Sequence, residues 1–270
     1  MKTYVITGAT SGIGEALLKE FAGVGIVFAG YRNSQKVEKL KSYGENVIPF
    51  YIDITKPDTI SAAADFIKKR TGKIDTLINA AGCVVAGAVE NLSAERLRYQ
   101  FEVNTFSHLA FSQGLLSLLE GGKIINISSM SGFGIFPFIS PYCASKRALD
   151  IIFNSLLIET GGRVKVVSIK PGVIATPLWE KSVEENFESL KEDKTYEKEM
   201  AFMAENALKN GKKGLDVRKV VEVVKKADSL KNPKSSYTVG RDAKLAEIFS
   251  KLPQDLLNTL IKAGLKARIK

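Results

Sequence analysis

The sequence contains very little cysteine or histidine, and this scarcity excludes several kinds of site. Cys83, Cys143 and His108 are the only residues of these two types among 270. They cannot form a metal-ligand cluster of the usual spacings, so we expect no metal site. Two distant cysteines favour a reducing compartment, and we expect a cytoplasmic protein. We expect His108 to be a packed helix residue and Cys143 to be inert.

The sequence also lacks an apolar run suited to a membrane span. Its longest stretch without charge, residues 124–145, contains an asparagine, five serines, two glycines and two prolines. This composition indicates a strand followed by a loop. The first residues run directly into an apolar strand and lack the apolar core and cleavage site of a signal peptide.

Charge of neither sign is concentrated in one region. The net charge of +10 comes from 39 Lys and Arg against 29 Asp and Glu. Such an excess can indicate nucleic acid, an anionic membrane or an anionic ligand as partner. Lysines alternate with glutamates through residues 184–198, which is typical of a solvated helix face. We therefore expect no nucleic-acid binding.

Short apolar runs rich in β-forming residues recur along the chain, with helical patterns between them. The expected strands are Thr3–Thr7, Ile26–Ala29, Val47–Ile52, Thr76–Asn79, Lys123–Ile127, Val164–Ile169 and Ser236–Val239. Buried strands joined by helices predict an α/β fold with a single Rossmann-type doubly wound parallel sheet of about seven strands and helices on both faces. No repeat or linker divides the chain, so we expect one dinucleotide-binding domain over residues 1–270.

Two segments depart from this alternation. Residues 177–215 form a Lys/Glu-rich helical insertion with large apolar residues such as Trp179 near its start, and an insertion there is more often a functional cap than a linker. Residues 244–270 form a helical extension with amphipathic spacing. We expect this extension to dock on the protein or on a partner subunit, and contact with a membrane surface is the alternative.

A glycine-rich turn follows the first strand, in the stretch T-G-A-T-S-G-I-G from Thr7 to Gly14. Glycines at 8, 12 and 14 permit a tight turn whose backbone approaches a pyrophosphate at the start of a helix. The second strand ends in A-G-Y-R-N, where a fold that prefers NAD requires an acidic residue. Arg32 suits a 2′-phosphate instead and favours NADP(H) over NAD(H), although a surface arginine is the alternative reading.

Several motifs between Thr7 and Thr176 resemble, in order, those of the short-chain dehydrogenase/reductases. Asn104 in F-E-V-N-T, Ser129 in I-N-I-S-S-M-S-G, and Tyr142 with Lys146 in Y-C-A-S-K are similar to the catalytic tetrad of that family. The stretch S-S-Y-T-V-G-R-D-A-K-L is similar to the ends of members related to hydroxysteroid and retinol dehydrogenases. We also expect a homodimer or a homotetramer.

The resemblance implies a set of cofactor-binding residues. The stretch from Asn79 to Gly82 looks like the family's N-N-A-G with its second asparagine replaced, and Asp53-Ile54 looks like the pair that borders the adenine. The full set is Gly8, Thr10, Ser11, Gly12, Ile13, Gly14, Arg32, Asn33, Asp53, Ile54, Asn79, Ala80, Ala81, Gly82, Tyr142, Lys146, Pro171, Gly172, Val173, Ile174 and Thr176.

The chemistry of carbonyl reduction explains why a tyrosine and a lysine would stand four residues apart. Hydride transfer puts negative charge on the carbonyl oxygen, which then requires a proton from an acid within reach. We expect Tyr142 to be that acid and Lys146 to lower its pKa. The resemblance adds that Lys146 holds the nicotinamide ribose, Ser129 orients the substrate oxygen and Asn104 positions a water.

The loop before Tyr142 carries Phe133, Phe136 and Phe138. These side chains either contact a hydrophobic substrate or pack the insertion onto the sheet. We therefore predict an oxidoreductase that transfers a hydride between NADP(H) and a hydrophobic small-molecule carbonyl or secondary alcohol. The alternative is an idle dinucleotide-binding sensor or assembly protein, which would not need the four residues that resemble the tetrad.

Overall fold

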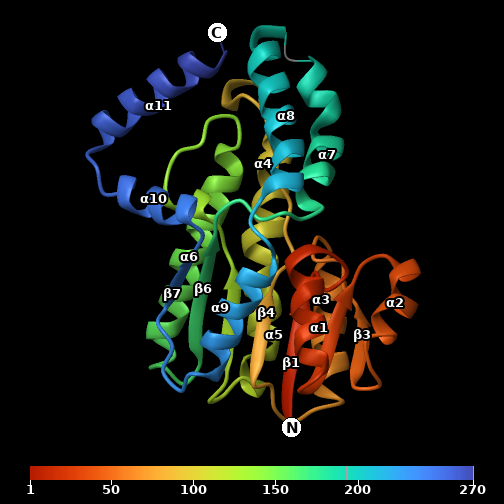
Figure 1. Ribbon diagram of the computed structural model, residues 1–270. Helices are drawn as coiled ribbons and strands as arrows, with labels where there is room; N and C mark the ends of the chain where they lie inside the picture. The colour runs from red at the N-terminus through yellow and green to blue at the C-terminus, as the bar shows by residue number, and fades with distance from the viewer. Residues whose placement is uncertain (193, 270) are drawn as a thin grey trace.

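Seven parallel strands form the centre of the protein, for which we describe a computed structural model (Figure 1). The backbone is described for residues 1–192 and 194–269, and side chains for 1–186 and 194–267. The spatial order β3-β2-β1-β4-β5-β6-β7 confirms the predicted doubly wound sheet. The strands are β1 Lys2–Thr7, β2 Gly25–Tyr31, β3 Val47–Tyr51, β4 Thr76–Asn79, β5 Lys123–Ile127, β6 Lys165–Pro171 and β7 Ser236–Val239.

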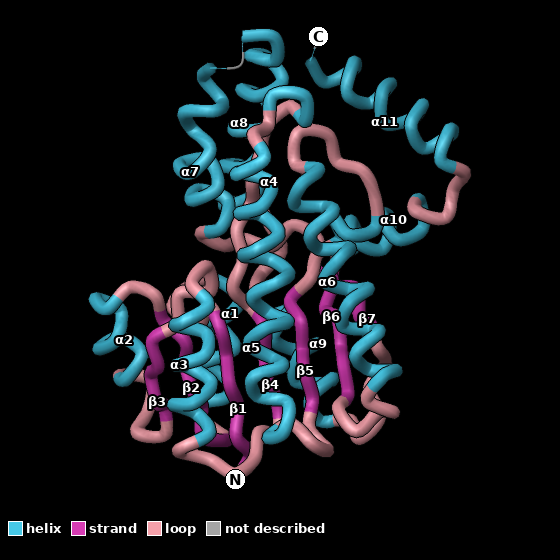
Figure 2. The backbone as a smooth tube through the Cα atoms, turned by 180° about the vertical axis from the view of Figure 1, so that it is seen from behind, coloured by secondary structure: helices cyan, strands magenta, loops and turns pink. Residues whose placement is uncertain are grey.

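Helices cover both faces of this sheet because neighbouring strand residues point to opposite sides. Tyr4 and Ile6 of β1 belong to one buried apolar cluster with α1, α2 and α9, whereas Val5 belongs to a second cluster with α3, α5 and α6. Figure 1 shows α1 and α9 before the sheet, and Figure 2 shows α3 and α5 on the opposite face. The helices are α1 Gly12–Ala22, α2 Val37–Lys41, α3 Pro57–Lys68, α4 Ala94–Phe101, α5 Ser107–Leu115, α6 Ser140–Glu159, α7 Leu178–Glu192, α8 Glu197–Lys213, α9 Arg218–Ser229, α10 Arg241–Phe249 and α11 Gln254–Ile269.

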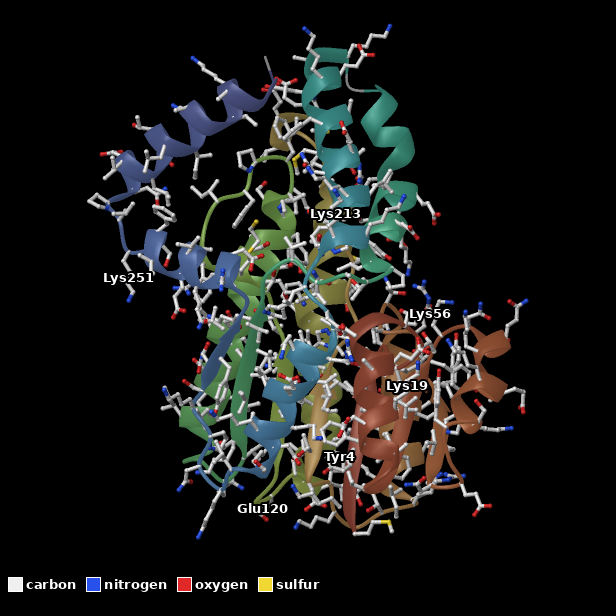
Figure 3. All side chains as sticks on the ribbon, in the orientation of Figure 1. Tyr4, Lys19, Lys56, Glu120, Lys213 and Lys251 are labelled. Carbon is white, nitrogen blue, oxygen red and sulfur yellow. The ribbon has the colours of Figure 1, made fainter. Side chains whose placement is uncertain are left out.

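A polar cluster around Asp228 of α9 fixes the amino end of the sheet. Its carboxylate accepts hydrogen bonds from Lys2 Nζ at 2.8 Å, from the Tyr4 hydroxyl at 3.1 Å and from Thr76 Oγ1 at 2.6 Å. Tyr4 lies low on β1, away from the α10 and α11 helices (Figure 3). Strand residues at this end therefore bind α9. A ligand site is expected at the other end of the sheet, where the strands have their carboxyl ends.

Helices α7, α8, α10 and α11 stand beyond the carboxyl ends of the strands (Figure 1). The insertion that carries α7 and α8 begins and ends at a parallel bridge between Ile174 and Leu215. Leu215 N–H donates to Val173 O at 2.8 Å, and Ala175 N–H donates to Leu215 O at 3.0 Å. None of the helices within the described part of the chain is long and apolar enough to cross a membrane.

Candidate active site

One cavity of about 1290 Å³ lies over the carboxyl ends of the strands. It is lined by Gly8 after β1, Arg32 after β2, Tyr142 of α6 and Pro171 of β6. In doubly wound folds, ligands bind at this edge, where the strand order reverses, which here is between β1 and β4. All of the predicted site residues line the cavity except Gly14, Asp53, Asn79 and Asn104.

The glycine-rich turn packs as closely as the sequence predicts. Gly8 has φ of 65°, and a Cβ on it would lie 2.8 Å from Ala81 Cα, while a Cβ on Gly14 would overlap the carbonyl of Gly8. Gly14 therefore packs α1 against the turn instead of lining the cavity. Ser11 caps α1 without a side-chain hydrogen bond, so the N–H groups of the first turn remain available to an anionic ligand.

Two cationic side chains of the cavity lie beyond β2. Arg32 and Lys36 both line it. Burial raises the pKa of the Tyr99 hydroxyl, and the nearby Arg32 guanidinium opposes that shift; Tyr99 reaches the cavity from α4. Sequence reasoning missed Tyr99, because nothing in its local pattern brings α4 to the end of β2.

Asp53 and Asn79 do not line the cavity but bond to residues next to its lining. The Asp53 carboxylate accepts hydrogen bonds from the N–H and the hydroxyl of Thr55, at 3.1 and 2.7 Å, and its neighbour Ile54 lines the cavity instead. Asn79 Nδ2 donates to Asn126 Oδ1 at 2.9 Å, between β4 and β5. Both side chains therefore stabilise loops and strands that carry the lining residues.

Ser129 and Tyr142 face one another in the cavity. Ser129 begins the short 3₁₀ turn η5, Met130–Phe133, where its hydroxyl accepts from Ser131 N–H at 3.1 Å. Burial raises the pKa of Tyr142 to about 12, and a hydrogen bond from Ser129 opposes that shift. The expectation that the pKa of Tyr142 is lowered is therefore wrong for this structure, and Tyr142 keeps its proton at neutral pH.

The Lys146 ammonium is buried beside Tyr142 and is bonded to the backbone. Lys146 is only 4% exposed, and its Nζ donates to Ile127 O at 2.8 Å. Nζ lies 5.9 Å from the centroid of the Tyr142 ring. Burial lowers the pKa of Lys146 to about 8, and the Asp150 charge opposes that shift. The ammonium is thus still charged at neutral pH.

A second buried lysine stands behind this pair, and the sequence did not reveal it. Lys170 Nζ lies 2.9 Å from Asp150 Oδ2, with side chains 9% and 4% exposed. It also lies 4.4 Å from the centroid of the Phe133 ring. Phe133 therefore packs on Lys170 and does not line the cavity. The only sequence signal was that Asp150 follows Lys146 by one helical turn.

Asn104 lies in a π-helical turn, Glu102–Phe106, and holds the segment after β4. Its Oδ1 accepts from Cys83 N–H at 3.0 Å, while its Nδ2 donates to Cys83 O at 3.0 Å and to Ser145 Oγ at 3.1 Å. A Cβ on Gly82 would lie 3.4 Å from Asn104 Oδ1 and 3.8 Å from Lys146 Nζ. Asn104 thus fixes the backbone directly beside Lys146, and π turns are frequent at functional sites.

The remaining histidine and cysteine are buried structural residues. His108 Nε2 lies 2.9 Å from Ala81 O, and burial lowers the pKa of His108 to about 3, so the ring is neutral. This confirms the prediction of a packed helix residue. Burial raises the pKa of Cys143 to about 11, which agrees with its expected inertness.

Apolar side chains form the outer walls of the cavity. Phe136 lines it, whereas Phe138 packs on Tyr196 with ring centroids 5.6 Å apart. Trp179 of α7 also lines it and donates from Nε1 to Ile174 O at 2.7 Å. Of the three loop phenylalanines, only Phe136 therefore has the position expected for contact with a substrate. Helices α8, α10 and α11 complete these walls.

Asn186 of α7, which the sequence did not single out, joins the insertion to the loop after β4. It is 2% exposed, donates to Val84 O at 2.8 Å and accepts from Ala86 N–H at 2.8 Å. Arg96 of α4 also donates to its amide oxygen. Asn186 therefore ties α7 to the loop after β4 and to α4.

Known proteins share both the sequence and the architecture of this chain. A family model described as short chain dehydrogenase matches residues 2–186. The chain is 32% identical over 253 residues to the NADPH-dependent 3-dehydrocapnine reductase of Ornithobacterium rhinotracheale, with 88% of each chain covered. It is 29% identical over 277 residues to the uncharacterized oxidoreductase YusZ of Bacillus subtilis, with 98% of each covered. A short chain dehydrogenase of Burkholderia cenocepacia, solved with NADP, superposes with a TM-score of 0.75 at 25% identity over 97% of this chain and 99% of the other.

Proposed function

The chain belongs to the short chain dehydrogenase family, and on that premise we propose that it is an NADPH-dependent reductase of hydrophobic carbonyl compounds. Membership makes it an oxidoreductase that binds a nicotinamide dinucleotide and acts on a carbonyl or an alcohol. The observation that carries the proposal is that Ser129, Tyr142 and Lys146 line the same cavity as the first turn of α1, whose N-cap makes no side-chain hydrogen bond.

The residues around the cavity fit a dinucleotide phosphate. The first turn of α1 offers unpaired N–H groups to a pyrophosphate, and Arg32 and Lys36 offer positive charge to a 2′-phosphate. Segment 171–176 would lie against the nicotinamide, which supplies the hydride when the cofactor is bound. Two relatives support this preference, since one is named NADPH-dependent and another was solved with NADP.

Tyr142 acts as the proton donor in this proposal. Its pKa of about 12 keeps the hydroxyl protonated across the physiological range, which is the form that carbonyl reduction requires. Ser129 lies beside that hydroxyl and holds the substrate oxygen next to it. Lys146, charged below about pH 8, stabilises the negative charge that develops nearby.

The walls of the cavity support a hydrophobic substrate. Trp179 and Phe136 line it together with Tyr142, and helices α7 and α8 contribute further lining residues. Asn186 holds α7 through three described partners. The substrate would therefore enter beside the insertion and lose its contact with water inside the cavity.

The rival function is a dinucleotide-binding protein without turnover, and Tyr142→Phe distinguishes the two. We expect this variant to bind NADPH as the wild type does, measured by fluorescence titration, and to lose at least about 10²-fold in the rate of NADPH oxidation with a carbonyl panel. Tyr237→Phe, outside the cavity, is the matched control. Unchanged turnover in Tyr142→Phe would show that another group donates the proton.

A further inference from the structure

The cavity extends well beyond the reacting residues, to the last helix of the chain. Its lining includes Leu257, Leu260, Ile261, Gly264 and Leu265 of α11, together with Leu245 and Phe249 of α10. The α10–α11 arm thus belongs to the same cavity as Tyr142. Figure 1 shows α11 across from α7 and α8, above the sheet.

The apolar residues of α11 that line the cavity form a stripe along one face of the helix. Residues 257, 260, 261, 264 and 265 follow the spacing of one helix face, and they span about 12 Å of the axis. The exposed Lys262 lies between them in sequence and the exposed Lys266 directly follows Leu265, and neither lysine lines the cavity. Leu260 remains 48% exposed although it lines the cavity. The stripe is therefore apolar surface that a ligand in the cavity would cover.

Two hydrogen bonds fix this arm relative to the reacting centre. Asp242 of α10 accepts from Val173 N–H at 2.7 Å, next to Gly172. Glu247 accepts from Thr238 Oγ1 of β7 at 2.8 Å. Both acidic groups of α10 thus make contacts within the protein. Segment 171–176, which we expect to border the nicotinamide, is bonded directly to α10, the helix that precedes α11.

The shape of this surface suits a chain better than a broad ring system. The stripe carries the aliphatic side chains of residues 257, 260, 261 and 265 along the helix axis, and Phe202, Met203 and Ala207 of α8 line the same cavity. Helix α11 packs against α8 among its described neighbours. Aliphatic and thioether side chains adapt to a flexible ligand. A ligand held at Tyr142 covers the whole row only if it is extended.

We propose that the substrate is a carbonyl compound with a single unbranched alkyl chain, whose carbonyl lies at Tyr142 and whose chain lies along the α11 stripe. This inference rests on the proposed reductase function. Each methylene that leaves water for the stripe should raise kcat/KM by up to about fourfold. The rise should stop once the chain passes the end of the stripe at Leu265.

The test is the rate of NADPH oxidation by the full chain with methyl ketones of increasing length, and with a steroid ketone as a compact comparison. Leu260→Ser and Ile261→Ser should flatten the dependence on chain length. Leu256→Ser is the matched control, because Leu256 is 47% exposed on the same helix but does not line the cavity. We expect it to retain the wild-type dependence.

Several results would overturn the inference. Turnover of short ketones with no gain from added methylenes would leave the reductase function standing and remove the chain site. A steroid ketone with a higher kcat/KM than every alkyl ketone would point to a compact substrate. If Leu260→Ser keeps the length dependence but loses binding to vesicles of phosphatidylglycerol and phosphatidylcholine, the stripe is a membrane-contact face. No NADPH oxidation with any compound would contradict the proposed function itself.

Discussion

Replacing the two buried lysines by methionine should change stability in opposite directions. Lys146 and Lys170 are 4% and 7% exposed, so both charges are removed from water in the folded protein. They differ in their partners, since Lys146 Nζ donates to the carbonyl of Ile127 and Lys170 Nζ forms an ion pair with Asp150. We expect Lys146→Met to stabilise the protein at pH 7 and Lys170→Met to destabilise it.

The magnitude for Lys146 follows from its pKa. Folding lowers this pKa from 10.5 to about 8, which corresponds to a cost of about 3 kcal/mol for the charged form at pH 7. The lost hydrogen bond to Ile127 O returns about 1 kcal/mol, so the net gain is about 2 kcal/mol. Between pH 8 and 10.5 the unfolded chain binds the extra proton, and wild-type stability rises with pH. The advantage of Lys146→Met should therefore disappear by pH 10.5.

For Lys170→Met the expected loss is about 3–5 kcal/mol, because Asp150 is left buried without its partner. The double variant Asp150→Asn, Lys170→Met should recover most of that loss. Urea unfolding at pH 7, 9 and 10.5 measures all three variants against the wild type. If the difference in unfolding free energy between Lys146→Met and the wild type is the same at pH 7 as at pH 10.5, burial of the Lys146 charge does not cost stability. If Lys170→Met leaves the free energy of unfolding unchanged, the ion pair with Lys170 is not needed to stabilise buried Asp150.

Three further outcomes are expected. The rate of carbonyl reduction should fall as pH rises through about 8, because Lys146 loses its charge there while Tyr142, with a pKa of about 12, keeps its proton; a rate that stays constant to pH 10 would contradict this. Arg32→Ala should lower the preference for NADPH over NADH about tenfold or more in steady-state assays, whereas equal losses with both cofactors would remove its role. Gly8→Ala should destabilise by about 1–3 kcal/mol in thermal unfolding, because its φ is 65° and its Cβ would lie 2.8 Å from Ala81 Cα, while Gly72→Ala, with no atom within 4 Å, should be nearly neutral.

The sheet could be predicted closely from the sequence because its signals are local. Buried parallel strands read as continuous apolar runs, and the predicted bounds Thr76–Asn79, Lys123–Ile127 and Ser236–Val239 are those observed. The glycine-rich turn was equally readable, since a strand, three glycines and a helix follow one another directly. Spacing alone placed Tyr142 and Lys146 on one face of α6.

What the sequence could not supply depends on contacts between distant elements. Spacing along α6 does not say how deeply Tyr142 is buried, and that burial is the reason that its pKa is raised instead of lowered. The partner of Asp150 lies on β6, and Tyr99 approaches Arg32 from α4. Such pairs are set by packing and leave no pattern within either segment.

The bridge between Ile174 and Leu215 should allow the α7–α8 insertion to be exchanged. Because the insertion leaves and rejoins the body at adjacent backbone positions, a shorter or longer cover can be grafted there while the seven strands keep their register. The graft has one requirement, which is a polar side chain in place of Asn186 that accepts from Ala86 N–H and donates to Val84 O. We therefore expect that substrate range can diverge in this scaffold without change to Tyr142, the proposed proton donor.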